Sequence, residues 1–352
     1  MQLETFEDVN ASITKNSGRP FHLLLGNGFS MAFDPSIFSY NALYDFVASL
    51  NDDLLSKVLG VVQTKNFEQM MAQLSTFSSL ATVFGADQTI VDKANATTKK
   101  LKQSLIDAIK ALHPEHVFMI PDDRCQVCAS FLAQFLSTGG HVFTSNYDLL
   151  LYWVLMRAHI ASSGDGFGRD REDDESDPTS EAQYSELRWG RNRDSQRIFY
   201  LHGALPLFDT GIEIVKEEYG GSQDYLLEMI GRRINAGQYP VFVTAGTGEE
   251  KLNQIMHNRY LTNCYETLSA IEGSLVTFGF NFGPYDEHII EAINVAAKHG
   301  HKSPRKLWSV YIGVYNKMDV PRVEGIAGKL KCKVHVFDAV CSFIDFWTKG
   351  IG

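Results

Sequence analysis

The 352-residue sequence lacks long apolar runs, and its first residues lack the positive charge of an export signal. The first eight residues carry acids instead, at Glu4, Glu7 and Asp8. No segment approaches the roughly 20 consecutive apolar residues that a membrane-spanning helix requires. We therefore expect a cytoplasmic protein with no membrane partner.

Basic residues are also few, since 32 Lys and Arg stand against 42 Asp and Glu, for a formal net charge of −10. The longest basic stretches are Arg191-Asn192-Arg193 and Gly231-Arg232-Arg233. A surface that binds nucleic acid needs a stripe of positive charge to neutralise phosphates. The composition therefore disfavours a nucleic-acid partner.

Cysteine is scarce, and the odd number of five does not indicate a disulfide framework, so we expect reduced thiols. The pair Cys125 and Cys128 falls on one helical stripe with Leu132 and Phe135. Tetrahedral zinc would need two further ligands, and the sequence offers none at a suitable spacing. We expect this pair to pack within a helix, and we expect no metal site.

Apolar residues make up 44% of the chain, which is enough for a large core. Helical periods alternate with short apolar runs bounded by Gly, Asn or Asp, and such runs are typical of strands buried on both faces. This alternation predicts an α/β, Rossmann-like fold, with a mostly parallel sheet and helices on both faces. The predicted strands are residues 22–26, 141–146, 198–203, 240–246, 274–280, 307–314 and 333–338.

Two long segments interrupt this alternation. Residues 46–136 are helical in pattern almost throughout, so we expect a helical insert or subdomain there, within one domain that spans residues 1–352. Residues 164–195 include an acidic run from Asp170 to Asp177 and few apolar side chains. Like charges without apolar surface predict a solvated, mobile loop.

The first polar strand end is the turn Gly26-Asn27-Gly28-Phe29-Ser30. Glycines allow a backbone to approach a pyrophosphate, and Ser30 could add its hydroxyl at the start of the next helix. The alternative is a tight strand-to-helix turn with a serine cap. A dehydrogenase is disfavoured, because Met31 stands where its third glycine would be and Asp45 lies inside a helical stripe.

The second strand end is Thr144-Ser145-Asn146-Tyr147-Asp148. Asn146 offers a donor and an acceptor and Asp148 offers two acceptors, which suits ribose hydroxyls or a water molecule. The alternative is an Asx turn that caps the following helix.

Two further strand ends carry histidines. His202-Gly203 follows an apolar strand, and His202 could act as a base near neutral pH or serve a structural role. Asn281, Asp286 and His288 follow the run that ends at Phe280, where they could bind an adenosine ribose or cap a helix. Thr247 and Glu250 have the spacing of a capping box, so we expect a helix cap there and no phosphate site.

The four strand ends, taken in order, resemble the motifs of the sirtuin superfamily: Gly26-Asn27-Gly28-Phe29-Ser30, Thr144-Ser145-Asn146-Tyr147-Asp148, Leu201-His202-Gly203 and Gly279-Phe280-Asn281. The closer resemblance is to the bacterial SIR2-like branch, in which several members degrade NAD during anti-phage defence. It covers most of the chain, from about residue 22 to residue 338, apart from the helical segment.

The resemblance implies NAD⁺ as the substrate and no prosthetic group. It makes Asn146, Asp148 and His202 the catalytic residues, with Gly26, Gly28 and Ser30 along the pyrophosphate and Gly279 and Asn281 toward the adenosine. The full NAD-binding set that we expect is Gly26, Asn27, Gly28, Phe29, Ser30, Ser145, Gly203, Gly279, Phe280, Asn281 and Asp286.

The sequence departs from protein-deacylating sirtuins in one respect that bears on function. Their zinc ribbon follows the catalytic histidine, whereas only Cys264, Cys332 and Cys341 follow His202 here. We therefore expect a metal-independent NAD⁺ glycohydrolase, and the resemblance implies an anti-phage effector that forms homo-oligomers and works with a separate sensor or ATPase. The alternatives are an ADP-ribosyltransferase and a non-catalytic NAD or ADP-ribose sensor.

Overall fold

The computed structural model describes residues 3–15, 19–38, 40–50, 52–62, 67–114, 116–169, 186–218, 225–243, 246–298 and 305–340. The acidic run of the predicted mobile loop, Asp170 to Asp177, lies outside these residues.

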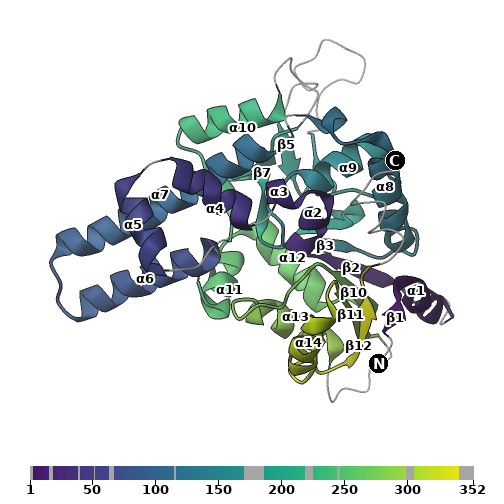
Figure 1. Ribbon diagram of the computed structural model, residues 1–352. Helices are drawn as coiled ribbons and strands as arrows, with labels where there is room; N and C mark the ends of the chain where they lie inside the picture. The colour runs from purple at the N-terminus through teal and green to yellow at the C-terminus, as the bar shows by residue number, and fades with distance from the viewer. Residues whose placement is uncertain are drawn as a thin grey trace, which may run out of the picture.

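A seven-stranded parallel sheet forms the centre of the molecule (Figure 1). Six of the predicted strands are in it, and the α/β, Rossmann-like fold is confirmed. The apolar runs form strands because both faces are covered, and all five residues of β2 are buried. In spatial order the strands are β1 (Glu4–Thr5), β12 (Lys333–Asp338), β11 (Leu307–Val314), β10 (Gly273–Phe278), β2 (Phe21–Leu25), β3 (Val142–Thr144) and β6 (Ile198–Tyr200).

The strand order reverses direction between β2 and β10. From β2 the chain continues outward to β3 and β6, and it then returns to the other side of β2 to add β10, β11 and β12. In open α/β sheets, ligands bind at the carboxyl ends of the strands beside such a switch point. The topology therefore favours the turns that follow β2 and β10 as the place where a ligand binds.

Helices cover both faces of this sheet (Figure 1). Phe6 and Phe131 pack against each other on one face, with ring centroids 5.3 Å apart, and Phe131 also contacts Phe278 of β10. Cys125 and Cys128 are buried in the same helix as Phe131, so the predicted packing of this pair is confirmed. The covering helices are α1 (Phe6–Thr14), α8 (Asp122–Leu136) and α9 (Leu150–Ala158) on that face, and α12 (Arg259–Ser269), α13 (Glu287–Ala297) and α14 (Val320–Ala327) on the other.

The described chain between β2 and β3 is helical. Figure 1 shows α5, α6 and α7 extending away from the parallel sheet, with α6 packed along α7, whereas α8 lies on the sheet against β2 and β3. None of the helices in the described part of the chain is both long and apolar enough to cross a bilayer. The elements are α2 (Asn27–Phe33), α3 (Pro35–Phe38), α4 (Tyr40–Ser49), α5 (Asp53–Val62), α6 (Phe67–Val83), α7 (Gln88–Leu112), η1 (Val117–Met119) and α8.

A second, antiparallel sheet of five strands is the main feature that the sequence patterns did not predict. The run at 240–246 was expected among the parallel strands, and this is wrong, because its strand β9 pairs antiparallel with β7. A short apolar run indicates burial but not the direction of its partner. The sheet order is β4 (Phe167–Gly168), β5 (Leu187–Trp189), β8 (Ile214–Lys216), β7 (Gly203–Asp209) and β9 (Pro240–Phe242).

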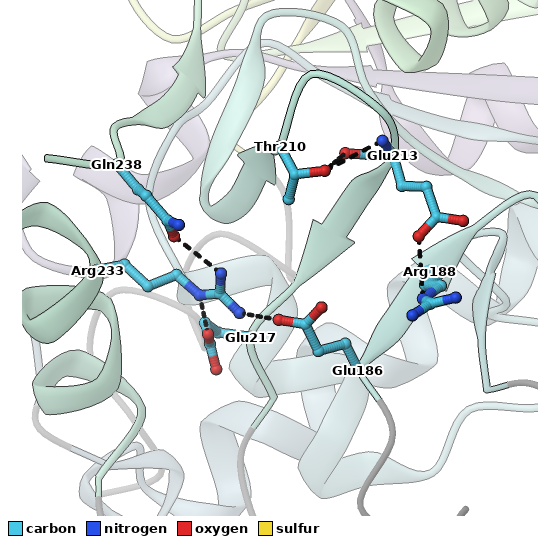
Figure 2. A network of polar contacts seen from close by, with 7 residues as sticks. All are labelled: Glu186, Arg188, Thr210, Glu213, Glu217, Arg233 and Gln238. Atoms are coloured by element: carbon cyan, nitrogen blue, oxygen red, sulfur yellow. Dashed lines mark hydrogen bonds and ion pairs between the residues drawn. The ribbon is translucent and has the colours of Figure 1, made fainter. Parts of the chain in front are cut away.

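A network of charged side chains ties helix α10 (Leu226–Asn235) to the second sheet (Figure 2). Arg233 forms ion pairs with Glu217 and Glu186, and it donates to Gln238 Oε1 at 2.9 Å. Because this arginine contacts residues beside β5, β8 and β9, it fixes the helix over one end of the sheet. The remaining described helices are α11 (Gly248–Met256), η3 (Arg193–Ser195) and η4 (Lys317–Asp319).

Gly203 is the corner at which the chain leaves the parallel sheet for the antiparallel one. It follows β6 by three residues and begins β7, with φ of +82°. An added Cβ would lie 1.8 Å from the carbonyl oxygen of Val241 in β9. Both the left-handed backbone and the contact with β9 require glycine here.

We predict that Gly203→Ala destabilises the fold far more than Gly237→Ala. Gly237 has the same φ of +82° but no atom within 4 Å of an added Cβ, so it isolates the backbone effect. Gly237→Ala should lower the free energy of unfolding by about 1–2 kcal/mol, and Gly203→Ala by at least about 3 kcal/mol because β9 must move. Urea unfolding of both variants measures the difference, and equal losses would contradict the proposed crowding.

Candidate functional site

The four polar strand ends found in the sequence lie on four neighbouring strands. In the order β10, β2, β3 and β6 these strands are adjacent and parallel, so their carboxyl ends share one edge of the sheet. The edge also contains the switch point between β2 and β10. The motifs are therefore brought together by strand order, although 250 residues separate Phe29 from Gly279.

The turns after β2 and β10 touch through their backbones. The amide of Gly28 donates to Gly279 O at 3.0 Å, and the amide of Gly26 donates to Phe278 O at 3.0 Å. An added Cβ on Gly26 would lie 2.5 Å from Gly279 O, and one on Gly279, where φ is +64°, would lie 2.4 Å from Phe29 N. The glycines serve this close approach, and a pyrophosphate at the turn would have to use groups other than the amides of Gly26 and Gly28.

Ser30, Asn146 and Asp148 form one hydrogen-bonded group across β2 and β3. The Asn146 side-chain amide donates to Ser30 Oγ at 2.9 Å and to Gly26 O at 3.1 Å, and Ser30 Oγ donates to Asp148 Oδ2 at 2.6 Å. These bonds fix the Asn146 side chain. Its Oδ1 is buried and has no hydrogen-bond partner among the described residues.

Asp148 is a carboxyl group with an unusual environment. Burial raises its pKa to about 6, against the opposing effects of the hydrogen bonds from Ser30 and from the Leu150 amide. The Leu150 amide donates to Asp148 Oδ1 at 3.0 Å, so the Asx turn that the sequence left as an alternative is present at the start of α9. One carboxyl oxygen thus accepts the amide of the first residue of α9, and the other accepts from Ser30 in the group around Asn146.

His202 pairs with a second histidine, His288 of α13. Their Nε2 atoms are 2.8 Å apart, and both side chains are buried. Burial holds the pKa of His202 well below its ordinary value and lowers that of His288 to about 3, and the Lys251 ammonium adds to both effects. Both imidazoles are therefore neutral at physiological pH.

Lys251 and Asp286 complete this part of the edge. Lys251 is fully buried, with its Nζ 3.6 Å from Asp286 Oδ1. Asp286 also accepts the Gly283 amide at 2.9 Å, which holds the turn between β10 and α13. The His202 ring stacks on the ring of Tyr147, with centroids 6.4 Å apart.

The remaining predicted binding residues lie in different surroundings. Phe29 and Phe280 are buried in the core, and the Ser145 hydroxyl is 3.5 Å from Leu25 O. Asn281 is exposed, and its carbonyl and side-chain oxygens both accept from Arg322, so it is not joined to the other polar groups. Asn27 begins α2 and is half-buried.

Lys251 was missed by the sequence analysis, although its segment was singled out. The predicted capping box is confirmed, since Glu250 N donates to Thr247 Oγ1 at 3.3 Å. However, Gly248, Lys251 and Ile255 are the buried residues of α11, at helical spacing. A lysine on the apolar stripe of a helix was the signal that pointed to a buried charge.

The described residues contain no group of three or more His, Cys, Asp or Glu side chains placed to hold a metal ion. The polar atoms at the edge are amide, hydroxyl, carboxyl, imidazole and ammonium groups. Such a set can hydrogen-bond sugar hydroxyls, orient a water molecule and accept a proton at Asp148.

Comparison with known proteins places the whole edge inside one family. A family model described as a domain of unknown function, DUF4917, matches residues 23–342, which include all four strand ends. No curated protein is similar enough to the chain to count as a match.

We predict that Ser30→Ala destabilises the protein more at pH 8 than at pH 5. Because the folded pKa of Asp148, about 6, is raised above its ordinary 3.8, the protonated form favours folding, and this contribution is lost as pH rises through 6. Removing the Ser30 donor takes a hydrogen bond from the ionised carboxylate, which should lower the free energy of unfolding by about 2 kcal/mol at pH 8. Urea unfolding at both pH values measures this.

Ser145→Ala is the matched control, because among the described residues the one hydrogen bond of its hydroxyl is the 3.5 Å contact with Leu25 O. Its effect should be small and the same at both pH values. If Ser30→Ala also cost the same at pH 5 and pH 8, Asp148 would not be the group that Ser30 stabilises.

Proposed function

The chain belongs to the family described as domain of unknown function DUF4917, and we propose that it is an NAD⁺ glycohydrolase, which cleaves NAD⁺ to nicotinamide and ADP-ribose. The observation that carries the proposal is the Asn146 side chain. Its amide is held by two hydrogen bonds while its buried Oδ1 has no partner among the described residues. An unsatisfied buried acceptor costs about 1–3 kcal/mol, so it calls for a ligand that donates to it.

A ribose hydroxyl or a water molecule is the donor that fits this position. Asn146 Oδ1 lies at the carboxyl edge of the sheet beside the switch point, where α/β proteins bind nucleotides. The order of the four motifs, which resembles that of the SIR2-like proteins, favours NAD⁺ among nucleotides. Two observations therefore support the proposal. One is the buried Asn146 Oδ1 without a described partner, and the other is the resemblance of the four strand ends to SIR2-like motifs.

The bond between nicotinamide and ribose in NAD⁺ can be cleaved by the groups present, which are the Asn146 amide, the Asp148 carboxylate and the His202 imidazole. Nicotinamide in NAD⁺ is a cationic leaving group, so the bonding electron pair departs with the ring nitrogen and needs no acid. The ribose carbon becomes oxocarbenium-like, and the oxygen of water adds to it. Fixed dipoles and a carboxylate stabilise such a centre, and one well-placed hydrogen-bonding group contributes about 2.7–4 kcal/mol.

Asp148 is the group that takes the proton of the attacking water. With a pKa of about 6 it is mostly ionised at neutral pH, yet it is more basic than an ordinary carboxylate. His202 has its pKa held well below the ordinary value, so it acts as a neutral hydrogen-bonding group toward the ribose. Asn146 then orients the water and Asp148 receives its proton.

Purified protein with NAD⁺ and no added acceptor should release nicotinamide and free ADP-ribose in equal amounts. Asn146→Ala and His202→Ala should each lower the rate by at least about 100-fold, since each removes a group that acts at the transition state. Asn235→Ala and His257→Ala change the same residue types at exposed positions and should leave the rate unchanged. A time course of both products measures this.

Two results would redirect the proposal. ADP-ribose found attached to protein, with little in free form, would indicate a transferase. Binding of NAD⁺ without any release of nicotinamide would indicate a sensing module. If both Asn146→Ala and His202→Ala hydrolysed NAD⁺ at the wild-type rate, the assignment of the site would be wrong.

The proposal includes assembly with further copies of the chain, as the resemblance implies for its oligomeric relatives. The end of the α6 and α7 hairpin, which projects from the molecule in Figure 1, exposes Phe77, Leu80, Val83 and Phe84. Val83 and Phe84 are 79% and 82% exposed, and residues 69–86 carry no charged side chain. An uncharged apolar surface of this kind favours a self-complementary contact over a strongly charged partner.

Replacing Val83 and Phe84 together by Glu should convert an assembled species to monomer, because burial of the new charges costs several kcal/mol. Ile212→Glu, at an apolar side chain that is 83% exposed in the turn between β7 and β8, is the control and should leave the mass unchanged. Light scattering coupled to size exclusion measures the mass. A monomeric wild type, or a Val83 and Phe84 variant with the wild-type mass, would contradict the proposal that copies of the chain associate through this surface.

A further inference from the structure

The contact between His202 and His288 couples the hydrogen positions of the two rings. Their Nε2 atoms are 2.8 Å apart, so one must donate and the other accept. A neutral imidazole has one N–H and one lone pair. With Nε2 of His202 engaged in this way, Nδ1 is the ring nitrogen left for a ligand.

The buried side chain of Lys251 lies beside this pair. The lysine side chain is fully buried, on the same helical stripe as Ile255 of α11, and its Nζ is 3.6 Å from Asp286 Oδ1. Asp286 precedes α13, and His288 lies two residues further along. A positive charge on either imidazole would therefore be opposed by the neighbouring Lys251 ammonium at low dielectric.

The groups that face His202 come from several elements. His288 is on α13, Lys251 is on α11, and Asp286 is in the turn between β10 and α13. Tyr147, from the turn after β3, stacks on the His202 ring, and its hydroxyl is occupied by a bond to the carbonyl oxygen of Val243. The Lys251 charge acts on His202 and on His288 in the same direction.

We propose that His288 and Lys251 are positioning residues that hold His202 as a neutral imidazole with Nε2 occupied, so that Nδ1 is presented to the ribose of NAD⁺. The ligand in this statement rests on the proposed function. In the reaction, His202 then binds and orients a ribose hydroxyl, and the Asp148 carboxylate takes the proton of the attacking water.

The first test uses a matched pair of variants at His288. Glutamine can place an amide group where the imidazole Nε2 lies, whereas phenylalanine keeps the ring and removes the polar atom. His288→Phe should lower kcat by about 10- to 100-fold with KM changed by less than about threefold, because a misoriented His202 still leaves most NAD⁺ contacts in place. His288→Gln should keep kcat within about fivefold of the wild type.

A purely structural role for His288 would give a different pattern. Both variants would then lose thermal stability and active fraction together, with unchanged kcat per folded molecule. Equal losses of kcat in His288→Gln and His288→Phe would also overturn the positioning role, because rescue by the amide is what the contact requires.

The second test reads His202 directly and does not depend on turnover. Nitrogen-15 NMR of histidine-labelled protein, with His202→Gln used for assignment, should show a neutral ring in one tautomer from pH 5 to pH 8. Lys251→Met should make the His202 ring protonate at a higher pH than in the wild type. Lys329→Met, which removes an exposed lysine, should leave this titration unchanged.

Lys251→Met leaves the Asp286 carboxylate without this ion pair, so the double variant with Asp286→Asn is measured beside it. The same upward shift of the His202 titration is expected in the folded double variant. An unchanged titration, or rapid exchange between tautomers in the wild type, would overturn the proposal. If the wild type released no nicotinamide, the proposed function would fail while this titration still tested the roles of His288 and Lys251.

Discussion

The contact between the turns after β2 and β10 is the constraint on which the rest of the candidate site depends. Gly26 and Gly28 meet Gly279 backbone to backbone, at distances that no Cβ would allow. This contact closes the switch point of the sheet and begins α2 at Asn27, which sets Ser30 beside Asn146 and Asp148. The other turn leads from Gly279 to Asp286 and His288, so one contact positions both polar groups of the edge.

The electrostatics of the two groups differ because their partners differ. Around Asp148 the neighbours are a hydroxyl and a backbone amide, which only partly offset burial, so its pKa stays near 6. Around His202 burial is the largest cause of the lowered pKa, and a second imidazole and a buried ammonium add to it, so the ring stays neutral. One edge therefore holds a carboxylate able to accept a proton and an imidazole able only to donate or accept a hydrogen bond, and the proposed hydrolysis would use both groups.

The second sheet packs beside the carboxyl edge of the parallel sheet, next to His202. Gly203 turns the chain directly from His202 into β7, and the Val243 amide returns to bond His202 O at 3.0 Å. The phenol of Tyr147 bonds the carbonyl of Val243 in turn. The antiparallel sheet thus packs directly against the segment that carries His202, and burial is the largest cause of the lowered pKa of this histidine.

The sequence by itself determined the parallel sheet and the four polar strand ends, because runs buried on both faces and the glycines that end them are local patterns. It also indicated the helix cap at Thr247 and the packing of Cys125 and Cys128. Only the tertiary structure decided that β9 joins an antiparallel sheet, that Asn281 turns outward to Arg322, and that Lys251 and His288 meet beside His202. The physical reason is that strand direction, burial of a charge and contact between distant side chains all depend on partners far away in the chain, and no local pattern records them.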